Sequence, residues 1–149
     1  MHLSVDYSHP MSEQVILQVE DDDGSYFVFN ELFKEICPDV RLQRARDGAE
    51  ALEEIQQLVK DPAIDLRLVL LDVFLPMVDG WSVLESVRAD ERLKHLPVTM
   101  FTNALSKRDQ ARCQDLGVEY LEKPADLEGL VLLVKEICAK VGGAVAGQI

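Results

Sequence analysis

The chain has 149 residues, of which 48% are hydrophobic, and this length and composition suit one domain with a sizeable core. Fifteen basic residues against 27 acidic ones give a net charge of −12, which disfavours binding to nucleic acid or to anionic lipid. The sequence has no apolar run near the roughly 20 residues that a membrane-spanning helix needs, and its polar start carries no signal peptide core. We therefore expect a cytoplasmic protein without a membrane segment.

The three cysteines are an odd number and lie far apart in the sequence, at positions Cys37, Cys113 and Cys138. They form neither a C-x-x-C pair nor a zinc-binding spacing. In a cytoplasmic protein this pattern predicts reduced, half-buried thiols.

Strand and helix patterns alternate along the first half of the chain. The apolar run Val15–Val19 predicts a strand, and apolar residues spaced i, i+3, i+4, i+7 over Phe29–Ile36 predict a helix. A second strand is expected at Val40–Ala45, followed by a helix whose apolar stripe spans Leu52–Val59. The nearly continuous apolar run Leu66–Leu71 is typical of a strand buried on both faces of a parallel sheet.

The alternation continues through the second half. A helix with its apolar residues within Trp81–Val87 is followed by a predicted fourth strand, Pro97–Phe101. A helix over Ser106–Leu116 begins with a capping-box pattern and is followed by a glycine suited to its end. A short strand at Val118–Leu121 precedes a last helix with a clean apolar stripe, Asp126–Val141.

Five such strand–helix units predict an α/β fold with helices on both faces of a parallel sheet. We expect a flavodoxin-like, doubly wound sheet of five strands in the order 2-1-3-4-5 with five helices. The domain is expected to span residues 14–141, between a flexible leader, residues 1–13, and a flexible tail, residues 142–149.

Polar residues follow the strands at the edge where such sheets carry function. Glu20 and Asp21 follow the first strand, Asp72 the third, Thr102 the fourth and Lys123 the fifth. Three carboxylates at one point repel one another, and a hard cation such as Mg²⁺ resolves that conflict. A carboxylate beside Mg²⁺ is able to attack phosphorus, while a lysine and a hydroxyl neutralise the phosphoryl oxygens.

Four segments in this order, ILQVEDDDG, LVLLDVFLPMVDGWSVL, VTMFTNALS and VEYLEKPAD, resemble the receiver domains of bacterial two-component response regulators. The resemblance covers roughly residues 14–141. It implies that Asp72 is the phosphoacceptor and that Glu20, Asp21, Asp72 and the backbone carbonyl of Phe74 hold Mg²⁺. No other cofactor is implied.

The resemblance also assigns roles to the last two strands. Thr102 matches the switch hydroxyl, and Lys123 matches the invariant-type lysine that precedes a proline in this family. Tyr120 matches an aromatic residue that turns inward on activation, although a static packing role stays open for it. The bond between Lys123 and Pro124 is expected to be cis on the same grounds. Asp22 and Asp23 are interpreted as helix caps and first-turn charges rather than ligands.

Only eight residues follow Val141, so we expect a single-domain regulator similar to the chemotaxis and phytochrome regulators. A sensor histidine kinase or a histidine phosphotransfer protein would supply the phosphoryl group, and an unknown downstream protein would be the target. Such a protein is no enzyme beyond phosphoryl transfer to, and hydrolysis from, its own aspartate. The alternatives are a degenerate receiver that serves as a scaffold and a Mg²⁺-dependent hydrolase with an aspartyl nucleophile.

The expected output surface combines Ser106–Leu116, Val118–Leu121 and Asp126–Val141. Charges of both signs lie along it, so a self-complementary homodimer through this face is compatible with the sequence. The cations are Lys107, Arg108, Arg112, Lys135 and Lys140, and the anions are Asp109, Asp115, Glu128 and Glu136.

Overall fold

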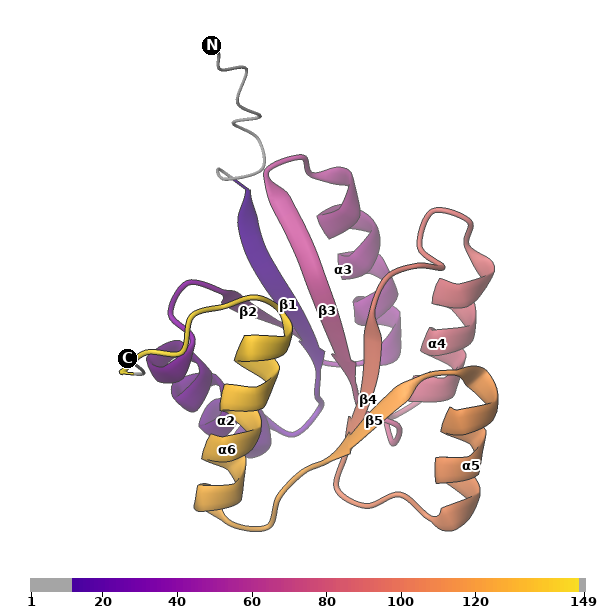
Figure 1. The fold of residues 1–149 in the computed structure, drawn as a ribbon. Helices are drawn as coiled ribbons and strands as arrows, with labels where there is room; N and C mark the ends of the chain where they lie inside the picture. The colour runs from indigo at the N-terminus through magenta and orange to yellow at the C-terminus, as the bar shows by residue number, and fades with distance from the viewer. Residues whose placement is uncertain (1–11, 148–149) are drawn as a thin grey trace.

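A five-stranded parallel sheet lies at the centre of the computed structural model, which describes residues 12–147 (Figure 1). Its strands pair in the order β2-β1-β3-β4-β5, and every pair is parallel. The strands are β1 (Glu13–Val19), β2 (Arg41–Ala45), β3 (Ile64–Leu71), β4 (Val98–Thr102) and β5 (Glu119–Glu122). The predicted sheet order is therefore confirmed, with each strand within two residues of its expected end.

Five helices connect the strands and cover both faces of the sheet (Figure 1). Helices α2 and α6 pack together over one face, whereas α3, α4 and α5 cover the other. The helices are α2 (Asp23–Ile36), α3 (Gly48–Lys60), α4 (Gly80–Ala89), α5 (Lys107–Leu116) and α6 (Leu127–Lys140). Among the described residues, none of these helices is long and apolar enough to cross a membrane.

The two faces of β1 contribute to two separate cores. Val15, Leu17 and Val19 point into the core beneath α3 and α4, whereas Ile16 points into the core beneath α2 and α6. A strand buried on both sides needs apolar residues at successive positions, which explains the continuous apolar runs of β1 and β3. Full burial of each such side chain contributes roughly 1.5–3 kcal/mol of transfer free energy.

Side-chain caps fix where the helices begin, so they also fix the loops at the carboxyl edge of the sheet. The Asp22 carboxylate accepts a hydrogen bond from the Ser25 amide at 2.7 Å, which lowers the pKa of Asp22 below its ordinary value. Asp47, Asp79 and Asp126 cap α3, α4 and α6 in the same way. Helix α5 begins at the expected serine cap and ends at a left-handed glycine.

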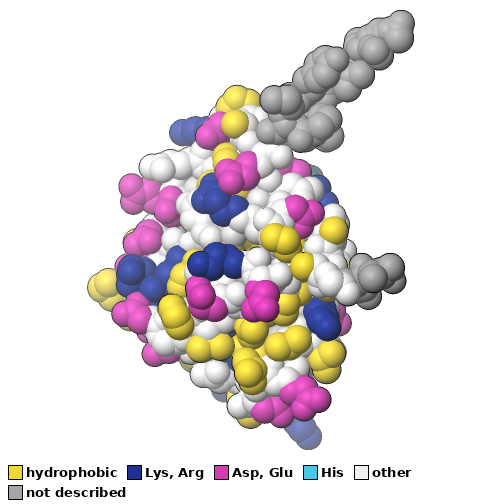
Figure 2. Space-filling view, turned by 90° about the vertical axis from the view of Figure 1, so that its left-hand side faces the viewer, with side chains coloured by type: hydrophobic (Ala, Val, Ile, Leu, Met, Phe, Trp, Pro, Cys, Tyr) yellow, Lys and Arg dark blue, Asp and Glu magenta, His cyan; other side chains and the backbone are white. Residues whose placement is uncertain are grey.

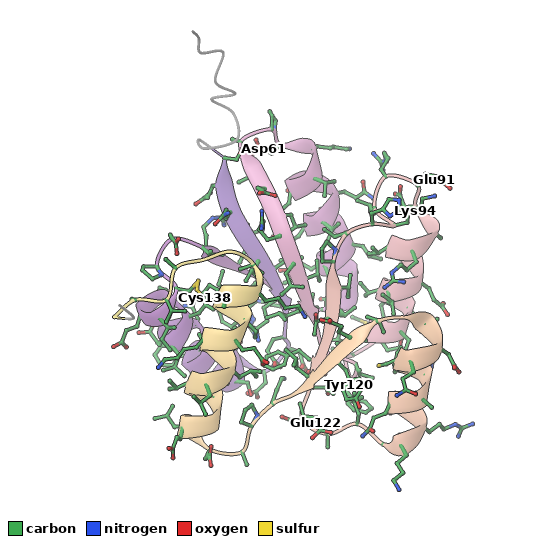
Figure 3. The ribbon with its side chains drawn as sticks, viewed as in Figure 1. Asp61, Glu91, Lys94, Tyr120, Glu122 and Cys138 are labelled. Atoms are coloured by element: carbon green, nitrogen blue, oxygen red, sulfur yellow. A yellow bond between two sulfur atoms is a disulfide. The ribbon has the colours of Figure 1, made fainter. Side chains whose placement is uncertain are left out.

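The structure corrects the prediction of reduced thiols, because Cys37 and Cys138 form a disulfide. Cys37 is the residue that ends α2, and Cys138 lies near the end of α6 (Figure 3). Their Cα atoms are 5.8 Å apart although 101 residues separate them in the sequence. Only the packing of α2 against α6 brings them together, so sequence spacing gave no signal. Cys113 is free and buried.

The end of the described chain differs from the flexible tail expected over residues 142–149. The Gly143 amide donates to the Cys138 carbonyl at 2.9 Å, and the Ala146 amide donates to the Ile36 carbonyl at 2.8 Å. Val145 packs against the core beneath α2 and α6. The last two residues, and residues 1–11 of the expected leader, lie outside the described residues.

Candidate functional site

The five polar residues singled out in the sequence converge at the carboxyl edge of the sheet. Glu20 and Asp21 directly follow β1, Asp72 follows β3, Thr102 ends β4 and Lys123 follows β5. Parallel strands bring these ends to one edge, and the order β1-β3-β4-β5 makes them neighbours. The sheet topology alone therefore assembles the site from four distant segments.

The Asp72 carboxylate is buried and held by three donors. Its Oδ1 accepts hydrogen bonds from the Thr102 hydroxyl and the Phe74 amide, both at 3.0 Å. Its Oδ2 lies 3.4 Å from the ammonium nitrogen of Lys123. The side chains of Asp72 and Thr102 are buried, with exposed fractions of 7% and 1% for the two residues. A carboxylate fixed in this way has one orientation, which a positioned nucleophile requires.

The Lys123 ammonium bridges two buried carboxylates, because it also pairs with Glu20 Oε1. The second oxygen of Glu20, Oε2, accepts a hydrogen bond from the Asp22 amide at 3.1 Å. The Lys123 amide donates to the Thr102 carbonyl at 2.8 Å, which anchors the start of the lysine side chain beside β4. One cation thus joins the ends of β1, β3 and β5.

Glu20, Asp21 and Asp72 each offer an oxygen within 4.8 Å of the others. Lys123 compensates one of these three charges, so negative charge remains at the site. Oxygen donors with excess negative charge are the set that Mg²⁺ and similar hard cations prefer, and the residues present therefore fit such an ion. Asp21 is exposed, which leaves this side open to solvent and to additional ligands.

The neighbouring acidic residues have other roles, as predicted. Asp22 caps α2, and Asp23 in its first turn pairs with Arg44 and Arg46 at 2.8 and 2.9 Å. The hydrogen bond from Arg44 is the main cause that lowers the pKa of Asp23 below its ordinary value. Both carboxylates thus have partners away from the acidic cluster.

Phe74 contributes to the site through its backbone, whereas its side chain faces solvent with 61% of the residue exposed. Its amide donates to Asp72, as described above. The expected role of its carbonyl oxygen as a metal ligand stays a prediction.

Tyr120 is half-buried in β5, opposite Met100 of β4, and packs against the core beneath α3 and α4 (Figure 3). This position is compatible with both the switch role and the packing role left open above, so its movement stays a prediction.

The expected cis bond between Lys123 and Pro124 is wrong, because the described residues contain no cis peptide bond. The expectation came from the family resemblance alone. The trans form is the ordinary preference of such a bond, and nothing in the local sequence opposes it.

Gly80 is a residue of the site that the sequence interpretation missed. A Cβ atom at Gly80 would lie 2.2 Å from the Asp72 carbonyl oxygen and 2.9 Å from the Val73 Cα. The Gly80 amide also donates to the Val73 carbonyl at 3.0 Å. Helix α4 therefore begins directly against the backbone of Asp72. In the sequence, the one sign of this close approach was a glycine that lies between Asp72 and the apolar stripe of the next helix.

We predict that Gly80→Ala lowers stability by about 1–3 kcal/mol, because backbone atoms must shift to admit the methyl group. The melting temperature should fall by roughly 2–10 °C, measured by calorimetry. Gly24→Ala is the matched control, since its Cβ would meet only Asp22 Oδ2 at 3.5 Å. Equal melting temperatures for the two variants would contradict the tight approach at Gly80.

This site and fold define a receiver domain, and comparison with known proteins agrees. The chain belongs to the response regulator receiver domain family, whose model matches residues 16–135. The family acts in two-component signalling.

Among the relatives, the chain is 35% identical over 124 residues to the probable methanogenesis regulatory protein FilR2 of Methanothrix harundinacea. This match covers 83% of the chain and 80% of FilR2. It is 33% identical over 134 residues to the response regulator Rcp1 of Synechocystis, covering 89% of this chain and 90% of Rcp1.

Solved structures give the same result. The Mn²⁺-bound form of Rcp1 superposes with a TM-score of 0.71 at 32% identity, covering 85% of this chain and 92% of Rcp1. The phosphorylated cyanobacterial phytochrome response regulator RcpA gives a TM-score of 0.75 at 30% identity, with the same shares covered. The chain is therefore a receiver domain similar to stand-alone response regulators.

Proposed function

We propose that this protein is a single-domain response regulator that accepts a phosphoryl group on Asp72. The observation that carries the proposal is the buried Asp72 carboxylate held between Thr102, the Phe74 amide and Lys123, beside Glu20 and Asp21. A complete set of acceptor, acidic pair, hydroxyl and lysine argues against a degenerate scaffold. The Mn²⁺-bound structure of Rcp1 and the phosphorylated structure of RcpA support the same chemistry.

The reaction transfers a phosphoryl group from a phosphohistidine of a sensor kinase or a phosphotransfer protein. An oxygen of Asp72 bonds to phosphorus while the phosphorus–nitrogen bond of the donor breaks, and the leaving imidazole takes up a proton. Lys123 and the Thr102 hydroxyl then donate to the phosphoryl oxygens. Glu20, Asp21, Asp72 and the Phe74 carbonyl would hold Mg²⁺, which supplies positive charge against the phosphoryl oxygens.

The surface beside the site suits a protein donor. Phe27 and Val28 of α2 and Leu127 and Leu132 of α6 are apolar and between 42% and 63% exposed. Figure 2 views this side of the molecule and shows hydrophobic side chains gathered on it. A cavity of about 330 Å³ between α2 and α6 reaches the Lys123 side chain. We infer that the histidine-bearing partner docks here, in the cytoplasm.

The output surface is assigned to α5, β5 and α6, where β5 forms the edge of the sheet. Two of its cations already have partners within the chain. The Arg112 guanidinium lies 4.3 Å from the centre of the Trp81 ring, and Lys140 pairs with Glu119. These contacts leave fewer cations free to pair across a self-complementary homodimer. We propose that phosphorylation changes the affinity of this face for a target protein or for a second copy of the chain.

Acetyl phosphate with Mg²⁺ should add one phosphoryl group to the protein, and Asp72→Asn should abolish the addition. Intact-mass spectrometry measures the change. Asp79→Asn is the control, because asparagine also caps a helix well and this residue lies on the same loop. Equal labelling of Asp72→Asn and the unchanged protein would overturn the assignment.

Mg²⁺ should raise the melting temperature, because an ion that binds the folded state better than the unfolded chain stabilises it by mass action. Asp21→Asn removes one oxygen anion of the cluster and should reduce this rise at the same Mg²⁺ concentration. Asp23→Asn should leave the rise unchanged, since Asp23 pairs with arginines instead. An identical Mg²⁺ response in Asp21→Asn would place the cation elsewhere.

Thr102→Ala should keep phosphorylation at Asp72 but weaken the change in binding at the face formed by α5, β5 and α6. The variant lacks the hydroxyl that contacts Asp72 and that links phosphorylation to this face. Sedimentation and partner binding with and without beryllofluoride measure that response. Thr99→Ala removes the other buried hydroxyl of β4 and serves as the control. A response confined to α2 would contradict the proposed switch.

A further inference from the structure

The disulfide between Cys37 and Cys138 has no part in the proposed phosphoryl transfer. Both cysteines are fully buried, and they join the end of α2 to the last turns of α6. These two helices follow the strands that supply Glu20 and Lys123, so the disulfide ties together the helices that flank the site. It does so at the ends remote from the site.

Residues 142–147, which we name the C-terminal strap, cover this disulfide. A Cβ atom at Gly143 would lie 2.6 Å from the sulfur of Cys37 and 2.8 Å from the sulfur of Cys138. The strap is held by the two backbone hydrogen bonds described above and by the Ala144 amide, which donates to Asp39 at 3.3 Å. Gly143 thus rests directly on both sulfur atoms, so the strap blocks the approach of a reagent from this side.

We propose that Cys37 and Cys138 form a reversible thiol–disulfide exchange site that the C-terminal strap gates. Disulfides of cytoplasmic proteins are usually transient or redox-sensing, so this inference rests on the cytoplasmic location in the proposed function. Because Gly143 contacts both sulfur atoms, the strap is the element that responds to their redox state. With the disulfide formed the strap is docked, and with the thiols reduced it is released.

The exchange requires a dithiol reductant, such as a thioredoxin-like protein or dithiothreitol. A thiolate of the reductant attacks one cystine sulfur, the Cys37–Cys138 bond breaks and a mixed disulfide forms. The second thiol of the reductant then attacks the mixed disulfide and releases the cysteine that is still bound, so the reductant becomes a disulfide. Two electrons and two protons end on Cys37 and Cys138, and a small disulfide such as oxidised glutathione reverses the process.

Reduction should loosen the contact between α2 and α6 without removing any residue of the site. The cavity beside the site is lined by Ser25 and Val28 of α2 and by Leu130 of α6. A looser helix pair therefore changes the shape of the surface that we assign to the phosphoryl donor. The phosphoacceptor and its donors keep their own contacts to β3, β4 and β5.

The gate is tested by the rate of reduction of the full chain by dithiothreitol, followed by mass spectrometry after thiol alkylation. The oxidised protein should carry one free thiol, Cys113, and the reduced protein three. Gly143→Ala should speed reduction at least about tenfold, because the methyl group lifts the strap from the sulfur atoms. Ala144→Ser adds one atom to the exposed neighbouring residue and should leave the rate unchanged. Equal rates in these two variants would overturn the gate.

Reversibility and strap release are tested on the unchanged chain in glutathione buffers. Circular dichroism should show a folded protein in both redox states, with a melting temperature roughly 5–15 °C lower after reduction. Hydrogen exchange at the Ala146 amide should accelerate at least about tenfold on reduction, and Cys37→Ala should match the reduced chain. A disulfide that resists reduction until the protein unfolds, or a strap amide that stays protected, would overturn the proposal.

Labelling by acetyl phosphate in the same samples separates this proposal from the proposed function. A chain that fails to take up phosphate but still exchanges its disulfide would contradict only the phosphoacceptor assignment. A chain that is phosphorylated but shows no reversible disulfide would contradict only the exchange site.

Discussion

The Lys123 ammonium between the carboxylates of Glu20 and Asp72 is the interaction on which the site depends. Both carboxylates are buried, and two buried anions at this separation repel each other unless a cation lies between them. The lysine comes from the end of β5, whereas the carboxylates follow β1 and β3. The contact therefore requires the complete strand order, and it links both halves of the sheet. The remaining negative charge at Asp21 and Asp72 gives the site its fit to a divalent cation.

The two cores, one on each face of the sheet, hold the residues of the site in place by different means. On one side, Gly80 allows α4 to begin against the backbone of Asp72, so the acceptor loop has little freedom. On the other side, Phe29 and Phe33 of α2 pack against β4 and α6, and the disulfide closes the far end of this helix pair. Asp72 is thus fixed by close backbone packing, whereas the side formed by α2 and α6 is held by a helix pair with a covalent tie.

The sequence by itself determined the alternation of strands and helices, because periodicity and caps are local properties. Leu66–Leu71 had to be a strand buried on both faces, and Asp22 and Ser106 had to precede helices. The convergence of Glu20, Asp72, Thr102 and Lys123 was also predictable, since parallel strands present their carboxyl ends at one edge. The proposed acceptor role of Asp72 came from the resemblance of four short segments to receiver domains, which is also a property of the sequence alone.

Tertiary structure decided the features that depend on contacts between distant segments. The disulfide joins residues 101 positions apart, and its formation depends on how closely α2 and α6 pack. The strap carries glycines and small side chains that are typical of a frayed end, yet Gly143 and Val145 find partners on that helix pair. Gly80 resembles an ordinary turn glycine until α4 is placed against Asp72. In each case the sequence shows a residue's own preference, whereas its role comes from a neighbour that only the folded chain supplies.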